Sequence, residues 1–169
     1  METLRAEFSL SFAATAPEVV ALRLFFSILL GGAIGFEREL RDKAAGLRTH
    51  VLVAAASCLF ALIALELIAL SGSRGGGVEE RIDILRLIEA VTAGVAFLAA
   101  GSIITSRGKV KGLTTGAGMW MAGAVGLACG VGLSGLAAIA AALAVIVLWL
   151  FKYLFDQIGF PAHEDRDRE

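Results

Sequence analysis

The longest uncharged run of this chain constrains its fold more than any other feature. No Asp, Glu, Lys or Arg occurs between positions 112 and 151, a stretch of 40 residues. As a single α-helix it would be about 60 Å long, or two crossings of a hydrocarbon core that is roughly 30 Å thick. A soluble domain of 169 residues could not bury such runs, so the sequence predicts an all-α, polytopic transmembrane helical bundle.

Polar interruptions divide the chain into five apolar segments. We expect transmembrane helices over residues 18–36, 50–70, 84–105, 113–133 and 136–155. They form one five-helix domain, 18–155, between a periplasmic or interfacial segment, 1–17, and a short cytoplasmic tail, 156–169. A signal peptide is the alternative reading of the first segment, which three hydroxyl residues interrupt.

The distribution of Lys and Arg predicts the orientation. Ten bases fall on one side of the five crossings: Arg38, Arg41, Lys43, Arg48, Arg107, Lys109, Lys111, Lys152, Arg166 and Arg168. The other side carries Arg5, Arg74 and Arg81, with Arg23 and Arg86 at helix ends. Because basic loops remain in the cytoplasm, we expect the N-terminus outside and the C-terminus inside.

Glycines predict close helix packing. Gly31 and Gly35 form a GxxxG pair, and a stripe that includes Gly116 and Gly123 predicts that helix 113–133 lies centrally in the bundle. Gly94 and Gly101 are further candidates on helix 84–105. The basic segment 107–112 is expected to be a plain turn, and Thr49, Thr114 or Thr115 to cap the helices that follow the two basic turns.

The polar stretch 37–50, ERELRDKAAGLRTH, is the main candidate site. Seven charges in fourteen positions cannot lie in hydrocarbon, and Glu37–Arg41 and Glu39–Lys43 are favourable i,i+4 pairs. A helix start flanked by bases suits an anionic ligand or an acidic partner residue. The candidate residues at this cytoplasmic mouth are Glu37, Arg38, Arg48, Thr49, His50, Thr114 and Thr115.

A second group of charges lies toward the outer ends of the helices. Arg23, Glu66, Arg86 and Glu89 fall at similar depths, and Arg86 and Glu89 are spaced i to i+3. Charges at membrane depth are functional candidates, although long side chains can also reach water from helix ends. This intramembrane polar cluster would neutralise itself or line a wet vestibule.

Metal and catalytic motifs are absent from the sequence. The two cysteines, Cys58 and Cys129, lie in apolar runs without CxxC or Cys/His spacing, and we interpret them as buried side chains. Mg²⁺ prefers several oxygen ligands, and Glu37, Glu66 or Glu89 could each supply one. No paired-carboxylate site can be read, so we expect no cofactor and no metal site, with Mg²⁺ as the alternative. No nucleophile elbow, phosphate loop or HExxH motif occurs, and a net charge of −1 gives no reason to expect nucleic acid.

Three stretches resemble the MgtC/SapB family of bacterial inner-membrane proteins. They are GGAIGFERELRDKAAGLRTHVLV (31–53), RLIEAVTAGVAFLAAGSII (86–104) and VKGLTTGAGMW (110–120). The positions that carry the resemblance are Glu37, Arg38, Gly46, Arg48, Thr49, His50, Gly94, Gly101, Gly112, Thr114, Thr115 and Trp120. Better-known members add a soluble cytoplasmic domain after the last helix, so the resemblance is to a short form.

The resemblance implies a five-helix protein of the inner membrane, linked to magnesium limitation and, in pathogens, to virulence inside macrophages. It also implies regulation of other membrane proteins, including the F-type ATP synthase. We therefore expect a non-enzymatic protein of magnesium, cation or acid-stress homeostasis that acts by association with itself or with another membrane complex. The alternative is a small-ion transporter or channel that uses the outer vestibule of Arg23, Glu66, Arg86 and Glu89.

Overall fold

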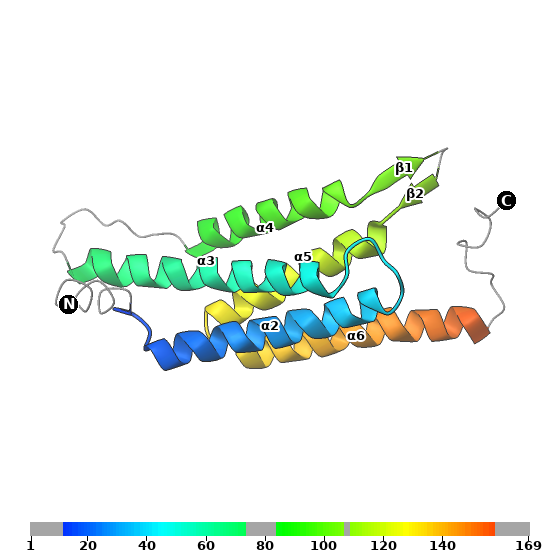
Figure 1. The fold of residues 1–169 in the computed structure, drawn as a ribbon. Helices are drawn as coiled ribbons and strands as arrows, with labels where there is room; N and C mark the ends of the chain where they lie inside the picture. Colours follow the sequence, from blue (N-terminus) through cyan, green and yellow to red (C-terminus); the bar gives the residue numbers. More distant parts are fainter. Residues whose placement is uncertain (1–11, 74–83, 107–108, 158–169) are drawn as a thin grey trace.

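The computed structural model describes residues 12–73, 84–106 and 109–157. These residues form five helices and a short β-hairpin, which Figure 1 colours along the chain from blue to red. The helices are α2 (Pro17–Glu39), α3 (Leu47–Ser73), α4 (Ile84–Gly101), α5 (Leu113–Gly130) and α6 (Ser134–Gln157). The prediction of an all-α chain with five helices is confirmed. Most of the predicted segments 1–17 and 156–169 lies outside the described residues.

Helix α5 lies in the middle of the bundle, as its glycines predict. It contacts α2, α3, α4 and α6. Its glycines do not form one stripe but face two neighbouring helices. A Cβ on Gly123 would lie 2.9 Å from Val95 of α4, and one on Gly130 would lie 2.5 Å from the carbonyl oxygen of Cys58 in α3. Small residues on two faces therefore let two helices approach the α5 backbone closely.

The GxxxG pair of α2 packs against α3. A Cβ on Gly31 would lie 2.5 Å from the Cβ of Ala54, and one on Gly35 would lie 2.8 Å from the Cβ of His50. Gly116 likewise faces the Ala99 carbonyl of α4. By contrast, Gly94 and Gly101 have no atom within 4 Å of an added Cβ, so within the described chain they make no helix contact of the kind expected.

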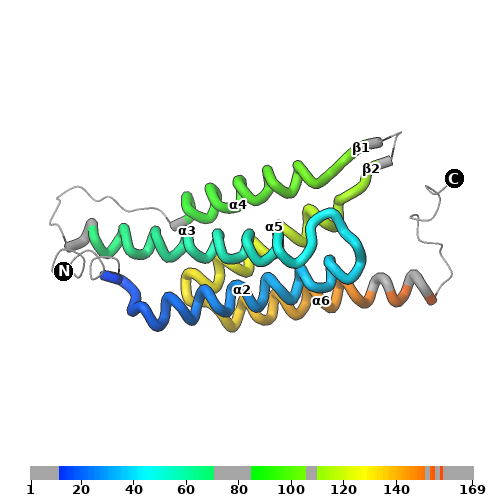
Figure 2. Tube along the Cα trace, in the orientation of Figure 1, coloured from blue at the N-terminus to red at the C-terminus, as the bar shows by residue number. Residues whose placement is uncertain are grey.

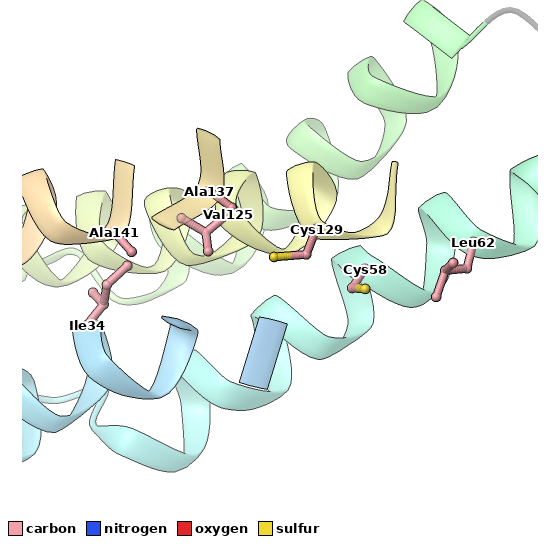
Figure 3. Close-up of a cluster of buried hydrophobic side chains, with 7 residues drawn as sticks. All are labelled: Ile34, Cys58, Leu62, Val125, Cys129, Ala137 and Ala141. Carbon is pink, nitrogen blue, oxygen red and sulfur yellow. The ribbon is translucent and has the colours of Figure 1, made fainter. Parts of the chain in front are cut away.

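The main core cluster joins α2, α3, α5 and α6 (Figure 3). Its buried members are Ile34, Cys58, Leu62, Val125, Cys129, Ala137 and Ala141. Both cysteines are free thiols inside this cluster, which confirms their interpretation as buried side chains. The core is built mostly from small and medium side chains, and this is why the helices can lie so close together.

Large apolar side chains cover the outside of the bundle. Phe25 of α2, Phe60 of α3 and Leu143 of α6 are each more than half exposed. Among the described residues, two helices are long and apolar enough to cross a bilayer, Pro17–Glu39 and Leu47–Leu70, and Ser134–Leu150 is a shorter apolar helix. A continuous apolar exterior of this kind is stable only against lipid or another apolar surface.

The predicted basic turn 107–112 was wrong in detail, because the flanking residues form a hairpin. Strand β1 (Ile104–Ser106) pairs antiparallel with β2 (Lys109–Lys111), and Ile104 lies opposite Lys111. The β-branched side chains in 104–110 favour extended backbone, so α4 ends at Gly101 and not at 105. The hairpin extends from the end of the bundle in Figures 1 and 2.

The predicted threonine caps were also wrong. Helix α5 begins after Gly112, whose φ of +89° is left-handed, and no side chain caps it. The carbonyl oxygen of Ser102 occupies the space where a Cβ of residue 112 would lie, so the chain can return from the hairpin only at a glycine. Helix α3 begins at Leu47, whose N–H donates to Oε2 of Glu39 over 2.9 Å. An acidic side chain from the preceding helix thus caps α3 in place of Thr49.

A buried charge cluster at one end of the bundle

Two charged side chains are buried where α2 ends. Glu37 is 5% exposed and Arg38 is 3% exposed, on the turn of α2 that faces α3 and α5. The Nε of Arg38 donates to Oε2 of Glu37 over 2.6 Å. Removing charges from water is costly unless each finds a partner, and this short contact supplies one for both residues.

Arg41 completes the cluster. Its Nε lies 2.5 Å from Oε1 of Glu37, an ion-pair separation that lacks the direction of a hydrogen bond. The i,i+4 pair expected from the sequence is therefore present. One carboxylate faces two guanidinium groups, so the cluster has a formal excess of one positive charge. Such an arrangement favours an anionic group or an acidic partner residue at this end of the bundle.

His50 lies beside the cluster on α3 and is fully buried. Its Nδ1 lies 2.9 Å from the carbonyl oxygen of Gly46, and because a carbonyl oxygen can only accept, Nδ1 carries the hydrogen of this contact. Its Nε2 has no hydrogen-bond partner in the described part of the chain. A Cβ on Gly118 of α5 would lie 3.0 Å from this Nε2 and 3.8 Å from Cδ of Arg38. Gly118 therefore faces both residues.

The structure brings some of the predicted site residues together and leaves others apart. Glu37, Arg38 and His50 meet at the junction of α2, α3 and α5, and Thr115 is buried on α5. Arg48 and Thr114 are exposed, so they present polar groups outward from the same end. The sequence interpretation missed Gly118; the signal available was a glycine two residues after Gly116, off the predicted stripe.

The four outer charges do not form the expected cluster. Arg23 donates from Nη1 to the carbonyl oxygen of Gly130 over 2.8 Å. Glu66 accepts the backbone N–H groups of Ala14 and Thr15 over 2.8 and 3.0 Å. Arg86 and Glu89 are exposed on α4, and no ion pair among the described residues joins any of the four. Two of these charges thus have structural partners on the backbone.

An apolar groove separates α3 from α4. It has a volume of about 420 Å³, and Phe60, Val91 and Leu98 are among its lining residues, with Ser57 as a polar neighbour. Within the described ranges, no three His, Cys, Asp or Glu side chains are grouped to hold a metal ion. The buried charges at the end of α2 therefore remain the main concentration of polar chemistry in the described bundle.

Sequence comparisons relate most of this chain to known proteins. The model of the MgtC family matches residues 24–157. "Putative magnesium transporter YhiD" of Escherichia coli K12 is 36% identical over 135 residues, which are 79% of this chain and 60% of that protein. "Protein MgtC" of Brucella abortus 2308 is 36% identical over 136 residues, covering 80% of this chain and 52% of the relative. "Protein SrpB" of Synechococcus elongatus is 34% identical over 144 residues, covering 80% and 76%.

The chain thus spans between half and two thirds of the first two of these relatives. No solved structure matches it.

Proposed function

This chain belongs to the MgtC family, and on that premise we propose that it is a non-enzymatic, multi-pass protein of the bacterial inner membrane. In this proposal the five helices all cross the bilayer, with the N-terminus outside and the C-terminus inside. The α2–α3 connection, the hairpin and the end of α6 lie at the same end of the bundle in Figure 1. These segments and the helix turns next to them carry eight of the 15 Lys and Arg residues, namely Arg38, Arg41, Lys43, Arg48, Arg107, Lys109, Lys111 and Lys152. This distribution supports a cytoplasmic position for that end.

We propose that this end binds an acidic segment of another membrane protein and thereby contributes to magnesium, cation or acid-stress homeostasis. The supporting observation is the buried Glu37–Arg38–Arg41 cluster, with its excess positive charge. The cluster fixes the end of α2, while Arg48 is exposed on the first turn of α3. The family resemblance suggests the F-type ATP synthase as a candidate partner.

Capture of membrane complexes tests this proposal. The tagged chain, solubilised in mild detergent from its native membranes, is compared with Arg48→Ala, Arg48→Lys and Glu18→Gln. Arg48 and Glu18 are both exposed, so these variants leave the fold unchanged. We expect Arg48→Ala to lose most of the captured partner, whereas Arg48→Lys keeps much of it and Glu18→Gln, at the other end of α2, keeps all of it. Equal capture by all four chains would contradict the proposal.

Ion transport is the second candidate, because the YhiD relative has magnesium transport in its name. The outer vestibule expected for this function is not assembled in the described chain, since Arg23 and Glu66 bind backbone groups instead of each other. A flux assay distinguishes transport from partner binding. The purified protein is placed in liposomes that contain a fluorescent Mg²⁺ indicator, and a tenfold Mg²⁺ gradient is applied across their membrane. We expect no flux above that of protein-free liposomes; a flux that saturates with Mg²⁺ would favour transport.

A further inference from the structure

One face of α4 has no covering element in the described bundle. The helix packs against α5 and α3, and Val95 and Ala99 are its buried residues at that contact. It lies at the edge of the bundle in Figures 1 and 2. On the outward side Phe97 is 81% exposed. A face so open is available to lipid or to another protein.

Two charges that have no partner among the described residues mark this face. Arg86 and Glu89 are exposed in the first two turns of α4, and no ion pair or hydrogen bond of either is present among the described residues. An acyl chain offers no partner to a charge, and intramembrane charges usually pair with one another. One base and one acid at neighbouring levels are complementary to the same face of an identical helix.

The alanines that follow continue the same face. Arg86, Glu89, Ala93, Ala96 and Ala100 are separated alternately by three and four residues, and all five are exposed. That spacing lines up one seam along a helix, here centred about 120° around α4 from Val95 and Ala99. Alanines along a seam allow two backbones to approach closely in lipid, where packing rather than the hydrophobic effect drives association.

We propose that this seam binds a second copy of the chain, and that the two α4 helices run parallel about a two-fold axis along the membrane normal. Arg86 of each copy then lies against Glu89 of the other, as a self-complementary interface requires. The inference rests on the membrane placement proposed above and does not involve the Arg48 end. The seam and the partner-binding end are separate surfaces.

Disulfide crosslinking in native membranes tests the seam. Ala93→Cys is oxidised with copper phenanthroline and compared with Leu98→Cys, exposed on another side of α4, and Leu143→Cys, exposed on α6. The wild-type chain is the background control, because Cys58 and Cys129 are fully buried. We expect a crosslinked dimer from Ala93→Cys alone. Equal yields from the three variants, a crosslink to a different protein, or no dimer because lipid covers the face would each overturn the proposal.

Exchanging the charges of Arg86 and Glu89 tests whether the two residues pair across the seam or only stabilise α4 itself. In the Ala93→Cys background, Arg86→Glu and Glu89→Arg each place like charges at the seam, and we expect each to lower the dimer yield by about tenfold or more. The double exchange restores the pair and should return the yield to within about twofold of the parent. A double exchange as defective as either single variant would overturn the pairing. We expect Arg48→Ala to leave the crosslink intact. Failure of the partner-binding proposal can therefore be told apart from failure of the dimer proposal.

Discussion

A Cβ on Gly118 of α5 would lie 3.0 Å from the Nε2 atom of His50 on α3. His50 is fully buried, and the Gly46 carbonyl oxygen holds its other ring nitrogen at 2.9 Å. The imidazole therefore fills the space between two helices at the charged end of the bundle. How closely α5 approaches α3 there depends on the absence of a side chain at position 118.

This contact predicts that Gly118→Ala destabilises the fold. The added methyl group must displace a ring fixed on its far side, and overpacking of this kind costs about 1–3 kcal/mol. Gly94→Ala is the matched control on a neighbouring helix, because no atom lies within 4 Å of its added Cβ. We expect that control to be neutral or stabilising by up to about 1 kcal/mol. Reversible unfolding in mixed micelles measures both; equal effects would contradict the prediction.

Neutralising Glu37 should destabilise the chain strongly. Glu37→Gln leaves Arg38 buried without its carboxylate and Arg41 without its ion-pair partner. Breaking a buried ion pair by removing one partner costs about 3–5 kcal/mol, since the remaining charge stays desolvated. Glu18→Gln removes the same charge from an exposed position and should change the free energy of unfolding by less than about 0.5 kcal/mol. The same micelle unfolding assay compares them, and a loss below 1 kcal/mol for Glu37→Gln would count against a buried pair.

The helical order of this fold could be predicted because hydropathy and charge act over long windows. Apolar runs of about twenty residues with at most two charges locate each helix, and the positions of α2, α3, α5 and α6 agree with the expected segments to within a few residues. Helix ends were less accurate, because they depend on single contacts. Glu39 caps α3 from another helix, and Gly112 stops the hairpin from continuing into α5.

The charged site was predicted only in part, for a similar reason. Local spacing predicted the Glu37–Arg41 pair, because residues four apart share a helix face. Sequence gave no signal that Arg38 would turn inward to Glu37, or that Gly118, far along the chain, would face His50. For the outer charges, the sequence predicted contacts that the structure does not contain. Their similar depth suggested a cluster, yet Arg23 and Glu66 bind backbone groups on different elements.

Gly126→Ala should separate α5 from α3. The atoms that a Cβ at 126 would meet belong to the backbone of Ala54, and a backbone cannot rotate away as a side chain can. We expect a loss of about 3 kcal/mol or more in the free energy of unfolding. Gly135→Ala, near the start of α6, meets no atom within 4 Å and should be close to neutral. Equal losses at 126 and 135, or a smaller loss at 126, would contradict the close approach of α5 to the backbone of α3.

Replacing Arg23 should loosen the turn between α5 and α6. Its Nη1 donates to the carbonyl oxygen of Gly130, one of the last carbonyls of α5, which lack partners within the helix. Arg23→Met removes this donor and leaves that carbonyl unpaired, at a cost of about 1–3 kcal/mol. Amide hydrogen exchange over residues 130–134 should quicken by about tenfold or more, while α2 away from position 23 keeps its protection. Arg48→Met removes an exposed base at the opposite end and should leave the exchange at 130–134 unchanged. Equal acceleration by both variants would contradict a stabilising role for the Arg23–Gly130 hydrogen bond.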